Sequence, residues 1–197
     1  MADALEYGSL SFRPLVAEDF LAIDRQPSQR VCMHGEPPTL AAALQLEEQA
    51  ESWSVFDGAG RLLACMGILE VFKGRCGVVW AVLAEHIGMH HLAISRFARG
   101  RIQISRLGRL EALARAVDVE PMTALLVDAW GRVDHAALLR YAMAKPTPEC
   151  RWPPMLGLRP VHVVRRFGAT GEAYVLFERV LPVCATAPAE MTVSAHG

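Results

Sequence analysis

Three histidines lie close together in the middle of the chain, at His86, His90 and His91. His86 and His90 are four residues apart, so on a helix they would share one face, as pairs of zinc ligands do. The H-E-x-x-H arrangement of zinc hydrolases is missing, however, and no third ligand stands nearby in the sequence. We therefore expect no metal site.

A series of arginines follows these histidines. Its members recur through one predicted helix, at Arg96, Arg99, Arg101, Arg106 and Arg109. Such a series is most often the solvated face of a helix, and the alternative is a role in binding phosphate or a partner. Nothing in the chain resembles a Ser-His-Asp or Cys-His nucleophile set, a P-loop or a Rossmann glycine fingerprint.

Composition narrows the class of protein. The chain has 197 residues, 52% of them hydrophobic and 21% charged, which suits one domain that folds without disulfides or a metal. A net charge of -1 argues against nucleic acid or an anionic membrane as the partner. The five cysteines are scattered and form no C-x-x-C pair, as in a reducing cytoplasm. We see no signal peptide and no apolar run of about 18 residues that could span a membrane.

Periodicity predicts strands and helices that alternate along the chain. Alternating or continuous apolar runs predict seven strands, at 10–16, 52–56, 62–72, 77–83, 122–127, 161–166 and 173–180. Helical spacing predicts helices at 18–29 with a break near Pro27, at 40–50, at 90–117 and at 134–143. The segment 145–154 is rich in helix breakers and is predicted as a loop.

Within this order, the strand at 77–83 is apolar on both faces, which indicates a central strand. The strand at 122–127 follows a long crossover helix, so we expect it to lie parallel to 77–83. The prediction is an α/β (α+β) domain with a mixed β-sheet of about seven strands and helices on both faces.

This order resembles the GNAT acyltransferase fold over roughly residues 9–181. Local matches are FRPL at 12–15, DGAGRLLACMGILEV at 57–71, GVVWAVL at 77–83 and the closing hairpin LGLRPVHVVRRFGATGEAYVLFERV at 156–180. We expect one GNAT-like domain at 1–183, followed by a flexible or partner-ordered tail at 184–197. More narrowly, AIDRQPSQR at 22–30, the tryptophan Trp80 and CRWPPMLGLRP at 150–160 resemble GNAT-like proteins encoded by phages and prophages.

The resemblance implies a cofactor loop after the strand at 77–83. In the family, the acetyl-CoA pyrophosphate rests on backbone N–H groups at the start of the next helix, in a Q/R-x-x-G-x-G/A loop. The matching stretch here, 84–90, has a single glycine, so the pattern is incomplete. Ile87, Gly88 and Met89 are the candidate cofactor-binding residues, and the cofactor is either acetyl-CoA or none.

The resemblance also implies catalytic roles for two residues. Glu85 stands where the family places a carboxylate that takes the amine's proton. Tyr141 ends a segment, starting at Asp134, that matches N-x-x-A-x-x-x-Y with Asp in place of Asn; in the family this tyrosine protonates the leaving thiolate. Fifteen residues separate Tyr141 from Gly157, where the family's Gly-Phe pair follows soon after the tyrosine. An alternative alignment runs through Arg151-Trp152 and leaves Tyr141 outside the site; the sequence leaves both open.

Two hypotheses about function follow. The first is a phage-encoded GNAT-fold protein with a degenerate acetyl-CoA site, which serves virion structure or assembly by contacting other phage proteins or copies of itself. It would reside in the virion or the host cytoplasm. The second is an active N-acetyltransferase for a small amine or a protein lysine, with Glu85 as base and Tyr141 as acid. The loop after the strand at 77–83 discriminates between them, since an enzyme needs its N–H groups aimed into a cleft.

Overall fold

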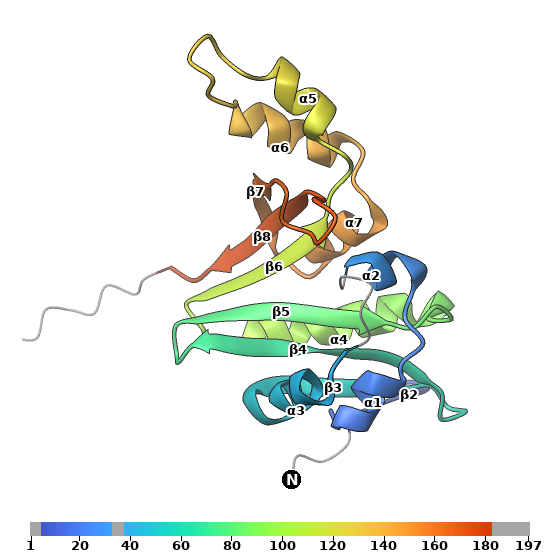
Figure 1. The fold of residues 1–197 in the computed structure, drawn as a ribbon. Helices are drawn as coiled ribbons and strands as arrows, with labels where there is room; N and C mark the ends of the chain where they lie inside the picture. The colour runs from blue at the N-terminus through green and yellow to red at the C-terminus, as the bar shows by residue number, and fades with distance from the viewer. Residues whose placement is uncertain (1–4, 33–37, 183–197) are drawn as a thin grey trace, which may run out of the picture.

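The computed structural model describes residues 5–32 and 38–182 and forms one mixed sheet. Its eight strands are β1 (Leu5–Tyr7), β2 (Leu10–Pro14), β3 (Ala50–Phe56), β4 (Leu62–Phe72), β5 (Cys76–Leu83), β6 (Arg109–Arg115), β7 (Arg159–Val164) and β8 (Tyr174–Val180). They lie in the order β1-β2-β3-β4-β5-β6-β8-β7 (Figure 1). All neighbouring pairs are antiparallel except β5 and β6, which are parallel.

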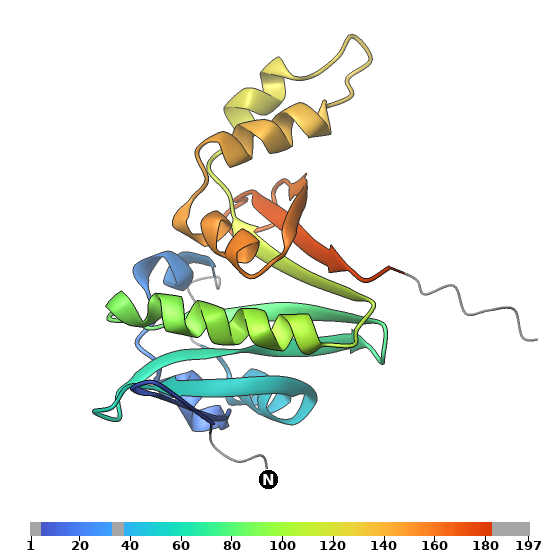
Figure 2. The same ribbon diagram turned by 180° about the vertical axis from the view of Figure 1, so that it is seen from behind.

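Helices cover both faces of this sheet, as predicted. They are α1 (Ala17–Ala22), α2 (Pro27–Cys32), α3 (Leu40–Gln49), α4 (His91–Ile104), α5 (Glu120–Leu125), α6 (His135–Ala144) and α7 (Pro148–Met155), with a short 3-10 turn, η1 (Gly88–His90), before α4. The helices α1 and α3 pack on one face, and α4 and α7 lie side by side on the other (Figures 1 and 2). The predicted tail at 184–197 lies outside the described residues.

Each face buries its own apolar cluster. Under α4, the rings of Phe12 and Phe97 stack with centroids 3.9 Å apart. Under α1 and α3, Phe20 meets the edge of Trp80 with centroids 5.7 Å apart, beside the buried Cys65. Burial raises the pKa of Cys65 to about 12, so this thiol stays protonated and packs as a small apolar group.

Most of the predicted elements are confirmed. The strands at 10–16, 52–56, 62–72, 77–83, 161–166 and 173–180 and the helices at 40–50 and 134–143 correspond to β2, β3, β4, β5, β7, β8, α3 and α6. The predicted helix at 18–29 is interrupted as expected, because α1 ends at Ala22 and Pro27 opens α2. Proline favours a first helical position, where its missing N–H costs nothing.

The predicted helix at 90–117 is wrong over its second half. Helix α4 ends at Ile104, Ser105 is extended, and the chain continues as β6. In β6, Leu110, Ala112 and Ala114 are buried and alternate with residues that are not, which is the two-residue period of a strand. The parallel neighbour of β5 is therefore β6 and not the segment at 122–127.

Two further segments are helical against prediction. The segment at 122–127 falls largely within α5, with Pro121 in its first turn, and only Thr123 of this helix is buried. The breaker-rich segment at 145–154 contains most of α7, which begins at Pro148. The Thr147 side chain caps α7 by accepting a hydrogen bond from the Cys150 N–H. A strong cap and a proline in the first turn outweigh the breakers that follow.

Two turns of the same sequence type, D-x-x-G-R, shape the ends of two hairpins. In the first, Oδ1 of Asp57 accepts from the N–H groups of Ala59 and Arg61, and Oδ2 accepts from Nε of Arg61 at 2.7 Å. Gly60 has φ +78°, which favours glycine. In the second, between α5 and α6, Asp128 makes the same contacts with Trp130 and Arg132.

Arg179 on β8 holds the far end of α4 in place. Its guanidinium donates to the backbone carbonyls of Ile102, Ser105 and Leu107, two of them at 3.2 and 3.0 Å. Ile102 and Ser105 lie at the C-terminal end of α4, where carbonyls lack partners within the helix. This side chain therefore fixes where α4 ends and β6 begins.

Replacing Arg179 with methionine is expected to lower the free energy of unfolding by about 2 kcal/mol, because the carbonyls at the end of α4 lose a charged donor. The measurement is urea unfolding followed by circular dichroism. Arg159→Met, at an exposed arginine on the neighbouring strand, is the matched control and should change stability little. Equal effects of the two substitutions would contradict this role for Arg179.

The first D-x-x-G-R turn predicts a dependence on pH. Hydrogen bonds from the backbone N–H of Arg61, followed by its guanidinium, lower the pKa of Asp57. Stabilisation by this carboxylate is therefore complete above its unfolded pKa of about 4 and is lost as pH falls through the lower folded value. The melting temperature of the wild type should exceed that of Asp57→Asn at pH 6, and the gap should shrink toward pH 2.5. A constant gap would contradict the prediction.

Candidate functional site

The sheet opens between β5 and β6. These parallel strands are in register only at Cys76↔Arg109, Gly77↔Leu110 and Val78↔Glu111, although β5 continues to Leu83 and β6 to Arg115. Beyond Val78 the two strands diverge, and the sheet splits into two halves (Figure 1). A cavity of about 410 Å³ fills the opening. This split is the candidate functional site.

The lining of the cavity is mainly apolar. Aromatic side chains come from β5, α7 and β8, and polar side chains come from α2 and the residue before it, from α4, from β6 and from α7. The aromatic residues are Trp80, Trp152 and Tyr174, and the polar ones are Gln26, Gln29, His91, Arg115 and Glu149. Burial lowers the pKa of His91, so its imidazole is neutral at pH 7.

Arg115 and Glu149 place opposite charges on the same wall of the cavity. Their closest nitrogen and oxygen atoms lie 4.0 Å apart, and both side chains are mostly buried. Because the two charges offset each other and His91 is neutral, the lining as a whole carries no net charge. Such a lining has no general attraction for a polyanion.

The glutamine of α2 covers the edge of β5 inside the split. Nε2 of Gln29 donates to the carbonyl of Ala81 at 3.0 Å, and Oε1 of Gln29 accepts from the N–H of Leu83 at 2.7 Å. The N–H of Gln26 donates to the carbonyl of Leu83 at 3.0 Å. A primary amide carries a donor group and an acceptor group side by side, as a strand backbone does. In the split, Gln29 therefore takes the place of a neighbouring strand.

Trp152 of α7 joins the two halves of the sheet. Its Nε1 donates to Oγ of Ser95 at 2.7 Å, and Oγ of Ser95 donates to the carbonyl of His91 at 2.7 Å. Ser95 belongs to α4, which packs on β4, whereas α7 packs on β6. The hydrogen bond therefore fixes the two halves relative to each other on the face covered by α4 and α7.

The loop after β5 is folded back on the protein. The N–H groups of Glu85, Ile87 and His90 donate to the carbonyls of Asp24, Ala84 and Ile87, at 2.9, 3.2 and 3.0 Å. The N–H of His91 donates to the carbonyl of Gly88. Four N–H groups of this loop are therefore engaged by the protein's own backbone.

The predicted cofactor-binding residues face different ways within this loop. Ile87 is buried in the core, whereas Met89 is 87% exposed. Gly88 has φ +44°, and a Cβ there would meet open space. The predicted base, Glu85, is exposed at the start of the loop.

Tyr141 lies elsewhere. It is partly exposed on α6, which packs on β7, and both views place α6 beyond β7 and away from the turn between β5 and α4 (Figures 1 and 2). The structure thus does not bring Tyr141 and Glu85 together. The helix that directly precedes Gly157 and lines the cavity is α7, which carries Arg151 and Trp152. This arrangement corresponds to the alternative alignment through Arg151-Trp152, which leaves Tyr141 outside the site.

Several residues that build the site were not identified from sequence: Gln26, Gln29, Ser95 and Glu149. Gln29 and Ser95 act through hydrogen bonds to partners far away in the chain, and such contacts leave no local pattern. The stretch at 22–30, which contains Gln26 and Gln29, resembles phage-encoded proteins, but this resemblance assigns no role to the two glutamines.

Comparisons with solved structures identify the fold. A GNAT-family acetyltransferase from Bordetella pertussis, described as putative, has a TM-score of 0.55 at 16% identity, covering 91% of this chain and all of that one. The spermidine N-acetyltransferase of Vibrio cholerae, solved with CoA and spermine, has a TM-score of 0.54 at 12% identity, covering 88% of this chain and 96% of that one. An acetyltransferase of Bacillus anthracis also reaches 0.54 at 12% identity, with 90% and 98% covered.

The chain has the GNAT fold. No family model and no curated protein matches the sequence. In the described part of this GNAT-fold chain, no helix is long and apolar enough to cross a membrane. Residues 5–32 and 38–182 also contain no group of three or more histidine, cysteine or acidic side chains placed to hold a metal ion.

The bond between Trp152 and Ser95 is tested by a double-mutant cycle. Ser95→Ala leaves the indole N–H without its acceptor, so we expect a loss of about 1–3 kcal/mol in the free energy of unfolding. Trp152→Phe removes the donor as well, so Ser95→Ala should cost about 1 kcal/mol less in that background. Denaturant unfolding of the four proteins measures the coupling. Additive effects would show that the hydrogen bond does not join α7 to α4.

Proposed function

We propose that this GNAT-fold protein does not use acetyl-CoA and acts through contacts with other proteins or with copies of itself, in the virion structure or assembly of a bacteriophage. The observation that carries the proposal is the amide of Gln29, which is bonded to both Ala81 and Leu83 on the edge of β5. The protein would reside in the virion or in the host cytoplasm.

Coverage of this edge bears on cofactor binding because acetyl-CoA has an extended arm with two amide groups. An extended chain that enters a split sheet gains affinity by pairing its amides with an open strand edge. Here the carbonyl of Ala81 and both backbone groups of Leu83 already have partners in α2 and the residue before it. A cofactor arm would have to displace Gln29 to bind.

The loop after β5 bears on binding of the acetyl-CoA pyrophosphate. Anion binding at the start of a helix needs N–H groups that point at the ligand. The N–H of Ile87, one of the three candidate cofactor-binding residues, donates to a backbone carbonyl, as do those of Glu85, His90 and His91, and Glu85 adds a negative charge at the start of this loop. The cavity lining adds no net positive charge to compensate.

The assignment to bacteriophage rests on sequence segments that also build the site. The stretch at 22–30 resembles phage-encoded GNAT-like proteins and contains Gln26 and Gln29. The stretch at 150–160 resembles them too and contains Trp152. The segments that resemble phage-encoded proteins are thus the ones that cover the edge of β5 and join the two halves of the sheet. This coincidence supports the proposal that the covered edge belongs to a phage-encoded type of the fold.

The second candidate is an active N-acetyltransferase that uses acetyl-CoA, with Glu85 as base and Tyr141 as acid. The observation in its favour is the cavity of about 410 Å³ between the diverging strands. This candidate requires α2 to move and Tyr141 to approach from α6.

Calorimetric titration with acetyl-CoA and thermal melting discriminate between the two. We expect no heat of binding and no rise in melting temperature at 1 mM acetyl-CoA. A ligand present at about 100 times its Kd would stabilise the fold by about 2.7 kcal/mol. Micromolar binding that is lost in Gly88→Trp would contradict the proposal and support the enzyme.

A further inference from the structure

Trp130 stands at the tip of the turn between α5 and α6 with its side chain in solvent. It is 82% exposed, which is unusual for the largest apolar side chain. Leu125 and Val127 beside it in the chain are 75% and 41% exposed. We call Leu125, Val127 and Trp130 the knob.

The turn that carries Trp130 is held rigidly. Oδ1 of Asp128 accepts from the N–H groups of Trp130 and Arg132, each at 2.9 Å, and Oδ2 accepts from Nε of Arg132 at 2.9 Å. Gly131 supplies the positive φ of +76° that the turn requires. An aromatic side chain on a rigid turn loses little conformational entropy on binding, which is the property of an interface anchor.

The split sheet offers a matching hole. Its cavity is lined mainly by apolar and aromatic side chains, and the charges of Arg115 and Glu149 offset each other. An apolar cavity of about 150 Å³ holds benzene, so one of about 410 Å³ has room for an indole. The polar groups of Gln26, Gln29 and His91 at its wall give the indole N–H possible acceptors.

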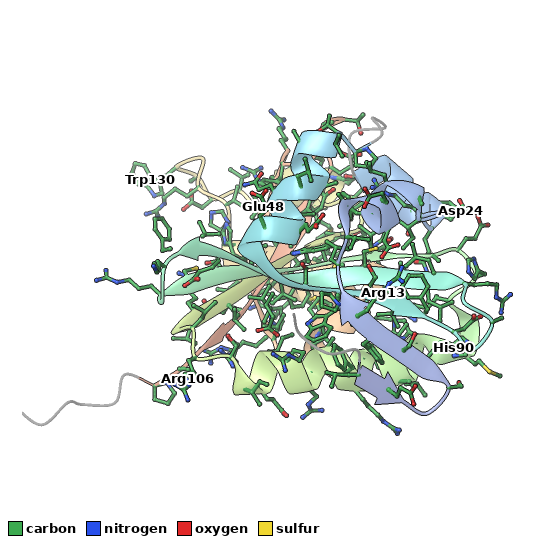
Figure 3. The ribbon with its side chains drawn as sticks, turned by 90° about the horizontal axis from the view of Figure 1, so that it is seen from below. Arg13, Asp24, Glu48, His90, Arg106 and Trp130 are labelled. Atoms are coloured by element: carbon green, nitrogen blue, oxygen red, sulfur yellow. The ribbon has the colours of Figure 1, made fainter. Side chains whose placement is uncertain are left out.

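The knob cannot fill the hole of its own chain. Figure 3 places Trp130 at one end of the molecule and His90, next to the cavity-lining His91, at the other. The cavity lies between β5 and β6, away from the turn that carries Trp130, so the indole of one copy is placed to enter the cavity of another copy.

We propose that the knob of one copy inserts into the split-sheet cavity of the next. This inference rests on the proposed function, since it requires the cavity to be free of acetyl-CoA. The contact pairs two different surfaces, so it joins copies into rings or open chains, or into a symmetric dimer when two copies make it reciprocally.

The surface area that the knob buries limits the affinity between two copies. A buried tryptophan removes about 150–250 Å² from solvent. Even with Leu125 and Val127 the knob falls short of the roughly 800 Å² per partner of a standard interface. Association is therefore weak for one contact, and it becomes extensive only at high protein concentration.

Sedimentation velocity over a range from about 10 μM to 1 mM tests the contact. We expect the average mass of the wild type to rise with concentration. Trp130→Ala removes the knob and should remain monomeric. Leu113→Trp places a bulky side chain at a partly exposed cavity-lining position and should also remain monomeric. Phe72→Ala, at an exposed aromatic residue outside both the knob and the cavity lining, is the control and should associate as the wild type does.

Mixing the two monomeric variants is the sharper test. Trp130→Ala keeps an intact hole and Leu113→Trp keeps an intact knob, so the mixture should form heterodimers and stop there. A wild type that stays monomeric at every concentration, or association that survives Trp130→Ala, overturns the proposal; in the first case the knob serves another protein. Thermal melts of both variants establish that they are folded.

Acetyl-CoA in the same experiment separates this inference from the proposed function. If 1 mM acetyl-CoA binds and dissociates the copies, the cavity is the shared site and only the proposed function fails. If acetyl-CoA does not bind and the wild type is monomeric, only the contact between copies fails.

Discussion

Strands β5 and β6 run parallel but share only three register positions before they diverge. A split of this kind exposes backbone N–H and C=O groups on two strand edges in the middle of a sheet, and buried groups of this sort need partners. Side chains from two helices, α2 and α7, and from the residue just before α7 supply several of these partners. The segment of α2 bonds to the edge of β5, and α7 lies against β6, where Thr147 and Cys150 both bond to the carbonyl of Arg115.

On the proposal that this protein works without acetyl-CoA, these contacts explain how the GNAT fold persists without a cofactor. In a split sheet, stability and ligand binding compete for the same backbone groups. When Gln29 satisfies them permanently, the fold gains hydrogen bonds and no longer needs a ligand to cover the edge. The bond from Trp152 to Ser95 holds α7 against α4 beside this cavity.

The sequence predicts those elements in which local pattern and tertiary packing agree. The runs at 62–72 and 77–83 are strands because their apolar residues suit a buried sheet. The prediction fails at 105–117 because Leu107, Leu110 and Leu113 also fit a helical period, and only pairing with β5 and β8 selects the strand. No local sequence pattern predicts that Gln29 caps the edge of β5, since its partners lie more than 50 residues away.

Amide hydrogen exchange at Leu83 tests the central claim most directly, because its N–H is bonded to Gln29 inside the split. The account predicts slow exchange in the wild type and a rate at least about tenfold higher in Gln29→Ala. The amide of Val82, which alternates with Leu83 and faces β4, should exchange equally slowly in both proteins. Equal rates at Leu83 in the two proteins would show that the edge of β5 is not covered by Gln29 and is available to a ligand.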